Sequence, residues 1–305
     1  MTKTMGLNTD MSTFAGLYPP IPTPFHPDES LNLNALADNL ARWSAEPLDG
    51  VVMPGSNSES VYLSRDERVE IWRVCGEVLP KLGKRFIAGT GAETTAETIA
   101  QTLIAAECGA EATLLLPPFF YKNSMSPEVL ISHYRTVADA SPIPVLLYNV
   151  PAFTGIDFPA SLFITLAEHP QIVGAKDSSV NVMKMASVLA ARPDFQVFVG
   201  SGGGLLPFLS IGAVGSIAAL ANVAAKPMRA IVDAFNQSDL SAARKLQLQV
   251  MNLNEALTAR FGVPGLKYAM DRVGLYGGPT RRPLLPLGEA GKREIDRLLA
   301  QVGLI

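Results

Sequence analysis

Residues 145–177 read VLLYNVPAFTGIDFPASLFITLAEHPQIVGAKD, and this stretch decides the fold. Two short apolar runs, 145–148 and 172–176, flank a longer segment with helical spacing. Neither run alternates between apolar and polar residues, which is typical of parallel strands buried on both faces. Parallel neighbours need a crossover connection, so the stretch predicts a strand, a helix and a second strand.

The same unit recurs along the chain. Further apolar runs lie at 16–21, 50–54, 85–89, 112–116, 197–200 and 214–218. Between these runs, Ser64, Thr94 and Ser126 are predicted to begin helices. A glutamate follows Ser64 and Thr94 by three residues, and a proline directly follows Ser126; both patterns are typical of a first helical turn. Eight right-handed units of this kind predict an α/β fold, a (β/α)8 TIM barrel, with a doubly wound open sheet as the alternative.

Strand patterns stop after about residue 224. Helical spacing then covers 240–260, 264–273 and 289–301, with a turn at residues 277–279, Gly-Gly-Pro. We expect a barrel core over residues 1–223, followed over 224–305 by the last barrel helix and a C-terminal helical extension of the same unit. The length of 305 residues agrees with this, since one α/β barrel already uses about 250.

Composition places the chain among globular proteins and argues against several partners. It is 48% hydrophobic and 17% charged, which suits a large buried core. Lys and Arg number 25 against 28 Asp and Glu, without a basic run, so we expect no nucleic-acid partner. Apolar stretches stay shorter than the roughly 18 residues of a membrane helix, and residues 1–14 lack the features of a targeting peptide. We therefore expect a cytoplasmic protein without membrane contact.

Cysteine and histidine usage argues against disulfides and metal. Cys75 and Cys108 lack CxxC spacing and fall in helical stretches, which is typical of reduced, packed thiols. His26, His133 and His169 stand apart from other ligand types. We expect no metal site.

In a barrel of this kind, the chemistry lies at the C-terminal ends of the strands. Lys176 ends the run IVGAK, which brings an ammonium group directly out of an apolar strand. Such a placement is costly without a purpose. Removal from water favours the neutral amine, which attacks a carbonyl carbon to form a Schiff base. A structural salt bridge is the alternative.

Three further strand ends carry polar or flexible residues. Tyr148 ends the run VLLY, where a buried phenol needs a hydrogen-bond partner, and a packed core tyrosine is the alternative. Residues 55–60, GSNSES, can hold an anion through backbone amides and hydroxyls, although a plain polar loop fits as well. Residues 200–204, GSGGG, lie near the usual phosphate position of barrels and equally admit a bulky substrate.

Together, Tyr148, Lys176 and the Ser56-Asn57 loop resemble the dihydrodipicolinate synthase / N-acetylneuraminate lyase family of class I aldolases. The resemblance extends from Gly16 to the C-terminus. It rests on the stretches 55–59 (GSNSE), 88–91 (AGTG), 148–151 (YNVP), 174–177 (GAKD) and 221–223 (ANV). Within the family, the chain is most similar to 4-hydroxy-2-oxoglutarate aldolase, through 133–134 (HY), 141–145 (SPIPV), 154–157 (TGID) and 260–267 (RFGVPGLK).

The resemblance implies a role for each residue. Lys176 would condense with the keto group of pyruvate or another 2-oxo acid, while Ser56 and Asn57 bind its carboxylate. Tyr148 would carry protons between the Schiff base and the substrate hydroxyl. No metal or other cofactor is implied, because the protonated imine itself accepts the electrons of the broken bond.

The resemblance also implies an oligomer. Family members borrow a tyrosine from a neighbouring subunit at the end of the fourth strand. Here Tyr121 is the candidate catalytic residue and Phe120 is the alternative occupant of that place. We expect a homotetramer built as a dimer of dimers.

Two departures from the family bear on the substrate. The synthases carry an arginine at the position of Phe153, and the sialic acid lyases carry acidic residues where Gly202 and Gly203 stand. Aspartate semialdehyde therefore loses the group that would bind its carboxylate, and a long polyol is less well bound.

These departures favour a retro-aldolase acting on a 4-hydroxy-2-oxo acid, with 4-hydroxy-2-oxoglutarate giving pyruvate and glyoxylate as the specific expectation. The alternatives are a 2-oxo-3-deoxy sugar acid aldolase or dehydratase, a synthase-like condensation, and a pyruvate-sensing barrel without enzymatic activity. The candidate substrate-binding residues are Ser56, Asn57, Ser178, Gly200, Ser201, Ile217 and Phe153.

Overall fold

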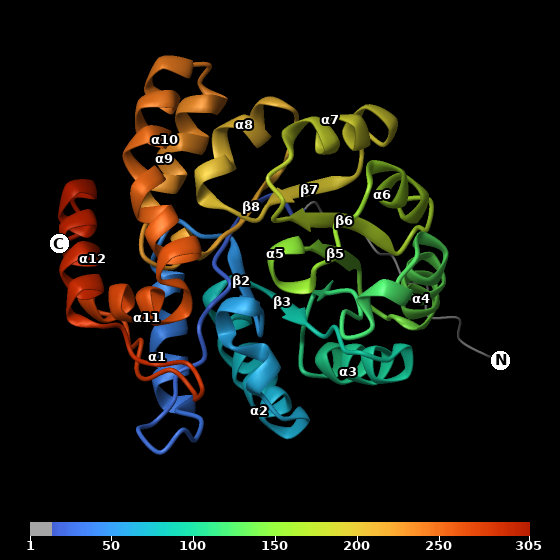
Figure 1. The fold of residues 1–305 in the computed structure, drawn as a ribbon, viewed down its shortest axis with the longest axis horizontal. Coiled ribbons are helices and arrows are strands. Elements are labelled where there is room, and N and C mark those ends of the chain that lie inside the picture. Colours follow the sequence, from blue (N-terminus) through green and yellow to red (C-terminus); the bar gives the residue numbers. More distant parts are fainter. Residues whose placement is uncertain (1–13) are drawn as a thin grey trace.

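Eight parallel strands curl into a barrel with helices on its outside (Figure 1). The computed structural model describes residues 14–305, so the expectation for the start of the chain lies almost wholly outside the described residues. Neighbouring strands follow chain order from β2 to β8, and β1 pairs with β8. Their bounds are β1 (Gly16–Tyr18), β2 (Gly50–Met53), β3 (Arg85–Gly89), β4 (Ala112–Leu115), β5 (Val145–Asn149), β6 (Ile172–Asp177), β7 (Gln196–Val199) and β8 (Gly215–Ile217).

Helices fill the connections between strands and then continue beyond the barrel. The bounds are α1 (Leu33–Ser44), α2 (Arg65–Val78), α3 (Thr95–Glu107), α4 (Pro127–Ala140), α5 (Pro151–Thr154), α6 (Ala160–Leu166), α7 (Val182–Ala191), α8 (Leu205–Ser210), α9 (Ala225–Asn236), α10 (Leu240–Glu255), α11 (Gly262–Arg272) and α12 (Glu289–Val302).

Two backbone hydrogen bonds join the ends of the sheet. The backbone N–H of Val52 donates to the carbonyl of Pro19 at 3.0 Å, and that of Ile21 donates to the carbonyl of Val52 at 3.1 Å. β1 itself stops at Tyr18, before the expected residue 21, because Pro19 and Pro20 carry no N–H to continue a ladder. The prediction of a TIM barrel is confirmed, and the open sheet is wrong.

β5 and β6 each extend one residue beyond the predicted apolar run. Asn149 and Asp177 face one another in register, and Asn149 Nδ2 donates to Asp177 Oδ1 at 2.6 Å. Both side chains are fully buried. Polar residues can extend a buried strand where they satisfy each other's hydrogen bonds.

The barrel has one apolar core inside and another around it. The inner core includes Tyr18, Val52, Leu146, Phe198 and Ile217, with Tyr148 at its upper layer. The outer core lies between the strands and the helices and includes Trp72 and Phe163. Every strand is thus covered on both faces, which explains why the apolar runs of the sequence do not alternate between apolar and polar residues.

The three predicted helix starts are present with one difference. Ser64 Oγ accepts from the N–H of Glu67 at 3.2 Å, while Glu67 Oε2 accepts from the N–H of Ser64 at 2.8 Å, which is a complete capping box. Thr94 caps α3 through the N–H of Glu97, but the Glu97 carboxylate accepts from Gln101 instead. Ser126 caps α4, with a proline in its first turn.

Beyond the barrel, α10, α11 and α12 stack beside α9 and α1 (Figure 1). These bounds match the helical spacing of the sequence closely, and α10 runs on through a π-helical turn, Ala256–Arg260. The segment after β7 lies against the middle and the C-terminal half of α10, where Gln247 Nε2 donates to the carbonyl of Gly202 and Asn254 Nδ2 donates to Ser201 Oγ, both at 3.0 Å. The extension therefore reaches the end of the barrel where the candidate residues lie.

Within residues 14–305, no helix combines the length and the apolar character that crossing a membrane requires. Over the same range, no three His, Cys, Asp or Glu side chains gather in a way that suits a metal ion. Cys75 is buried, Cys108 is half-buried, and the two thiols are free.

Candidate active site

The register of β5 and β6 places Tyr148 beside Lys176. Their Cα atoms are partners in the parallel ladder, so both side chains point to the same face, into the barrel. Lys176 is only 3% exposed. Its Nζ lies 4.0 Å from the centre of the Tyr148 ring. An amine and a phenol thus share one poorly hydrated site at the end of the barrel.

The Tyr148 hydroxyl faces Ser56 across the barrel. The two oxygens are 3.4 Å apart. Burial alone would raise the pKa of Tyr148, but the charge of Lys176 and hydrogen bonds from Lys176, Ser56 and Ser178 outweigh it and lower the pKa below its ordinary 10.0. This phenol releases its proton at a lower pH than an exposed tyrosine, which suits a proton carrier.

Lys176 takes no part in the ion pairs of residues 14–305. The carboxylate that follows it, Asp177, points outward from the barrel and lies 3.4 Å from Lys184 Nζ. Lys184 also lies 2.6 Å from Asp157. With Asn149, these residues form a network that runs from the buried Asp177 to the exposed Asp157, behind the strand ends that carry Tyr148 and Lys176. The neighbouring Asp177 carboxylate, which a structural salt bridge of Lys176 would need, is therefore already paired with Lys184.

The Ser56-Asn57 loop is a single 3-10 turn, and hydrogen bonds to the segment after β1 fix its position. Ser58 Oγ donates to the carbonyl of Ile21 at 2.5 Å and accepts from the N–H of Gly55 at 2.8 Å. Thr23 Oγ1 donates to the carbonyl of Ser58 at 2.6 Å. Ser56 and Asn57 are left half-buried at the barrel mouth, with their side chains outside this bonding.

The ends of β6 and β7 approach each other closely. A Cβ atom on Gly200 would lie 1.9 Å from Ser178 Oγ, so only glycine fits there. Ser201 Oγ accepts from Asn254 Nδ2 of α10 at 3.0 Å. Ile217 is buried in the inner core together with Tyr148. The candidates on β5, β6, β7 and the β2 loop are thus all found at one end of the barrel.

Two predicted residues stand apart from this group. Phe153 lies on α5 and is 69% exposed. Tyr121 is 72% exposed and packs edge-on against Phe120, with the ring centres 5.1 Å apart. Within the described part of one chain, no hydrogen bond or ring contact joins Tyr121 to Tyr148 or Lys176.

Several residues of the site escape sequence reasoning. Thr23, Ser58 and Glu59 hold the β2 loop, and Asn254 and Lys267 come from the extension. Glu59 and Lys267 stand inside the stretches 55–59 and 260–267 that carry the resemblance. Their pairing, across most of the chain, has no local signal.

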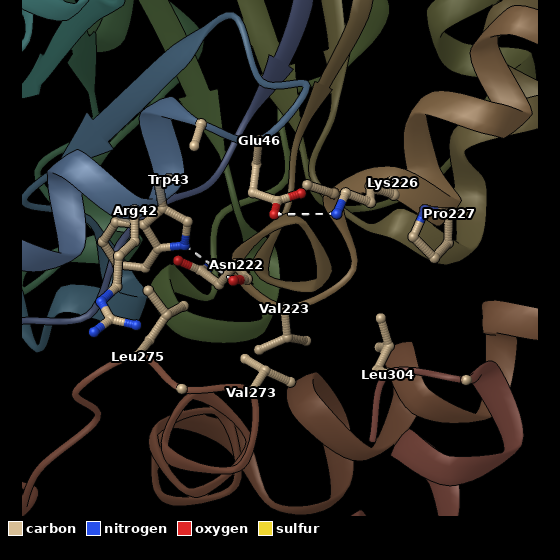
Figure 2. A pocket seen from close by; sticks show the side chains of 14 residues that line it. Arg42, Trp43, Glu46, Asn222, Val223, Lys226, Pro227, Val273, Leu275 and Leu304 are labelled. Atoms are coloured by element: carbon tan, nitrogen blue, oxygen red, sulfur yellow. Dashed lines mark hydrogen bonds and ion pairs between the residues drawn. The ribbon is translucent and has the colours of Figure 1, made fainter.

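A separate hollow of about 490 Å³ lies where α1, the segment after β8 and the end of the chain meet (Figure 2). Two polar contacts join residues of its lining: Trp43 Nε1 donates to the carbonyl of Asn222 at 3.0 Å, and Lys226 Nζ lies 3.6 Å from Glu46 Oε1. None of the candidate residues lines it. The candidate residues thus lie away from this hollow, at the barrel mouth around Lys176.

Comparisons with known proteins agree with this fold along almost the whole chain. The model of the dihydrodipicolinate synthetase family matches residues 13–302. A 4-hydroxy-tetrahydrodipicolinate synthase of Methanococcoides burtonii is 34% identical over 294 residues, which is 96% of this chain and 99% of the relative.

Solved structures are similarly close. A dihydrodipicolinate synthase from Bacillus anthracis superposes with a TM-score of 0.90 at 28% identity, over 94% of this chain and 98% of that one. A dihydrodipicolinate synthase from Acinetobacter baumannii, complexed with pyruvate, has a TM-score of 0.90 at 30% identity and covers 96% and 100%. These relatives are named as synthases, whereas the motifs of the sequence pointed to 4-hydroxy-2-oxoglutarate aldolase.

Proposed function

The chain belongs to the dihydrodipicolinate synthetase family, and from that premise we propose that it is a class I aldolase that forms its Schiff base on Lys176. One observation carries the proposal: the buried Lys176 amine lies 4.0 Å from the Tyr148 ring, and the Tyr148 hydroxyl lies 3.4 Å from Ser56. Nucleophile, proton carrier and carboxylate-binding loop are thereby brought to one point.

The chemistry follows from this placement. The neutral amine of Lys176 attacks the keto carbon of a 2-oxo acid, and water leaves from the carbinolamine after a proton arrives from Tyr148. In the cleavage direction, the C3–C4 bond breaks and its electrons pass to the iminium nitrogen. The 4-hydroxyl gives its proton to Tyr148, so an aldehyde departs. Tyr148 then gives this proton to C3 of the enamine, and hydrolysis of the iminium ion returns pyruvate, the free amine and one proton, which restores Tyr148.

We propose 4-hydroxy-2-oxoglutarate as the substrate, which gives pyruvate and glyoxylate. Phe153 offers an apolar ring where a guanidinium would bind the carboxylate of a longer aldehyde, and Gly202 and Gly203 offer no side chain to a sugar. The second candidate is condensation of pyruvate with aspartate semialdehyde. It is favoured by the synthase names of the relatives.

A substrate panel with two variants separates these candidates. We expect wild type to cleave 4-hydroxy-2-oxoglutarate with a kcat/KM at least about tenfold above that for N-acetylneuraminate, which needs only ~1.4 kcal/mol of differential binding. We expect little condensation with aspartate semialdehyde. Phe153→Arg should raise that condensation by about 10-fold to 100-fold through a charged hydrogen bond, while the apolar control Phe153→Leu should not.

Each other outcome of the panel contradicts part of the proposal. Faster cleavage of a 2-oxo-3-deoxy sugar acid removes glyoxylate as the product but leaves the Lys176 chemistry. Efficient condensation by wild type makes the chain a synthase. Pyruvate binding without turnover of any substrate identifies a pyruvate-sensing barrel.

We also propose a homotetramer built from tight dimers, in which Tyr121 enters the site of a neighbouring subunit. The exposed pair Phe120 and Tyr121 supports an intersubunit position, because two large aromatic side chains lie uncovered beside one another. Light scattering should give four times the mass of the chain, and Tyr121→Phe should lower turnover without changing that mass. A fully active monomer would exclude any contribution from a neighbour.

A further inference from the structure

We propose that a buried ion pair between Glu59 and Lys267 sets the position of the Ser56-Asn57 loop, which makes Lys267 a positioning residue for the substrate carboxylate. The inference rests on the proposed function, since it takes Ser56 and Asn57 as the carboxylate-binding residues. Lys267 comes from α11, outside the barrel, and it is buried, so we expect it to act through the loop and not by contact with the substrate.

The pair is deeply buried, and each member has one further hydrogen-bond partner. Lys267 Nζ lies 2.6 Å from Glu59 Oε1, and the two residues are 1% and 2% exposed. Lys267 Nζ also donates to the carbonyl of Pro279 at 2.7 Å, and Glu59 Oε2 accepts from the N–H of Arg281 at 2.8 Å. Burial lowers the pKa of Lys267, and the charge of Glu59 opposes that shift.

Glu59 holds the loop through its backbone. It stands between the 3-10 turns Ser56–Ser58 and Ser60–Tyr62, with φ 57° and ψ 36°, which is the left-handed region that residues with a side chain seldom adopt. The N–H of Glu59 donates to the carbonyl of Ser56 at 3.3 Å. A backbone in this conformation needs contacts that hold it, and the side chain of Glu59 supplies them through Lys267 and Arg281.

A second cation extends the same anchor. Arg281 lies 2.6 Å from Glu67 Oε1 and donates to the carbonyl of Tyr62 at 2.8 Å. The Phe25 ring lies below both cations, 4.6 Å from Lys267 Nζ and 4.3 Å from the Arg281 guanidinium carbon. The β2 loop, the start of α2 and the extension are therefore locked together at one place.

Stability alone does not account for this arrangement. A buried ion pair is weak evidence for stability, because apolar residues of similar volume often serve as well. An ion pair differs from an apolar contact in that it fixes direction, and here it fixes the one turn that presents Ser56 and Asn57. The anchor should therefore matter for substrates that carry a carboxylate and not for those without one.

The test compares trapping of two ketones on Lys176 by borohydride. Pyruvate carries the carboxylate, and acetone does not. We expect Lys267→Met to reduce the ratio of pyruvate to acetone trapping rates by about 10²-fold, the scale of a misplacement of about 1 Å. Lys267→Arg retains the charge in a bulkier group and should give an intermediate ratio. Arg229→Met is the control, since it breaks an ion pair to Asp49, below the start of β2, and should leave the ratio unchanged.

The outcomes separate this inference from the proposed function. A lower ratio with label still on Lys176 supports the anchor. An unchanged ratio in Lys267→Met, even with a lower melting temperature, makes the pair merely structural and overturns the inference. If Lys267→Met does not fold, Glu59→Gln removes the charge from the other side of the pair, and an unchanged ratio there decides in the same way. Failure of wild type to be labelled at Lys176 removes the proposed function, and the inference with it.

Discussion

Lys176→Met is expected to lower turnover by roughly 10⁴-fold to 10⁶-fold, the scale on which covalent enzymes lose activity with their nucleophile. Methionine is of similar length and suits a site that is 3% exposed, so the barrel should remain folded. It has no amine, and without an imine the electrons of the breaking bond have no acceptor. Turnover and borohydride labelling with pyruvate are the two measurements.

Peptide mapping after labelling identifies the lysine that reacts. Lys184 and Lys267 each lie 2.6 Å from a carboxylate oxygen, so both amines are already paired. Lys176→Arg is the matched control for charge, because a guanidinium keeps the positive charge but does not form an imine. Label on another lysine would refute the assignment, and activity lost to a chelator would indicate a metal-dependent aldolase.

Tyr148→Phe is expected to lower turnover by about 10²-fold to 10⁴-fold, the usual contribution of a general acid or base, while pyruvate is still trapped on Lys176. The pH profile adds an independent readout. Because the pKa of Tyr148 is lowered below 10.0, the protonated phenol is lost at lower pH, and the alkaline fall of kcat/KM should begin below pH 10. The fall assigned to this phenol should be absent from Tyr148→Phe.

Tyr18→Phe is the matched control for this substitution. Tyr18 lies in the same inner core, and among the described residues its buried hydroxyl has no hydrogen-bond partner. Removing it makes the same chemical change without touching the site, so turnover should stay within about twofold. If Tyr148→Phe retains full turnover, Tyr148 is a packed core residue and some other group carries the proton.

The barrel could be predicted from the sequence because burial on both faces leaves a plain signal, a short apolar run at each strand. An apolar run cannot predict the part of a strand that consists of buried polar residues. Asn149 and Asp177 continue β5 and β6 only because each satisfies the other, and neither residue reveals this alone. Pro19 and Pro20 shortened β1 for the opposite reason, since a residue without an N–H cannot extend a ladder.

The centre of the site could be predicted for a similar reason. An ammonium group at the end of an apolar strand is unusual in itself, and the strand order brings Tyr148 alongside Lys176. The anchor of Glu59 and Lys267 could not be predicted, because neither residue differs locally from an ordinary surface charge. The role proposed for Tyr121 involves a neighbouring subunit, and neither the sequence pattern nor a single chain can test it.

The link between Glu59 and the extension also has a consequence for the order in which a ribosome makes the parts of this site. Arg281, which donates to Glu59, follows it by 222 residues. At roughly 5–20 residues per second, the loop that presents Ser56 waits about ten to forty seconds for its anchor. Until then the Glu59 carboxylate lacks its partners and favours water over burial. The growing chain thus contains Lys176 well before the Ser56-Asn57 loop has its anchor, so on the proposed roles the site is completed only when the last helices of the chain have been made.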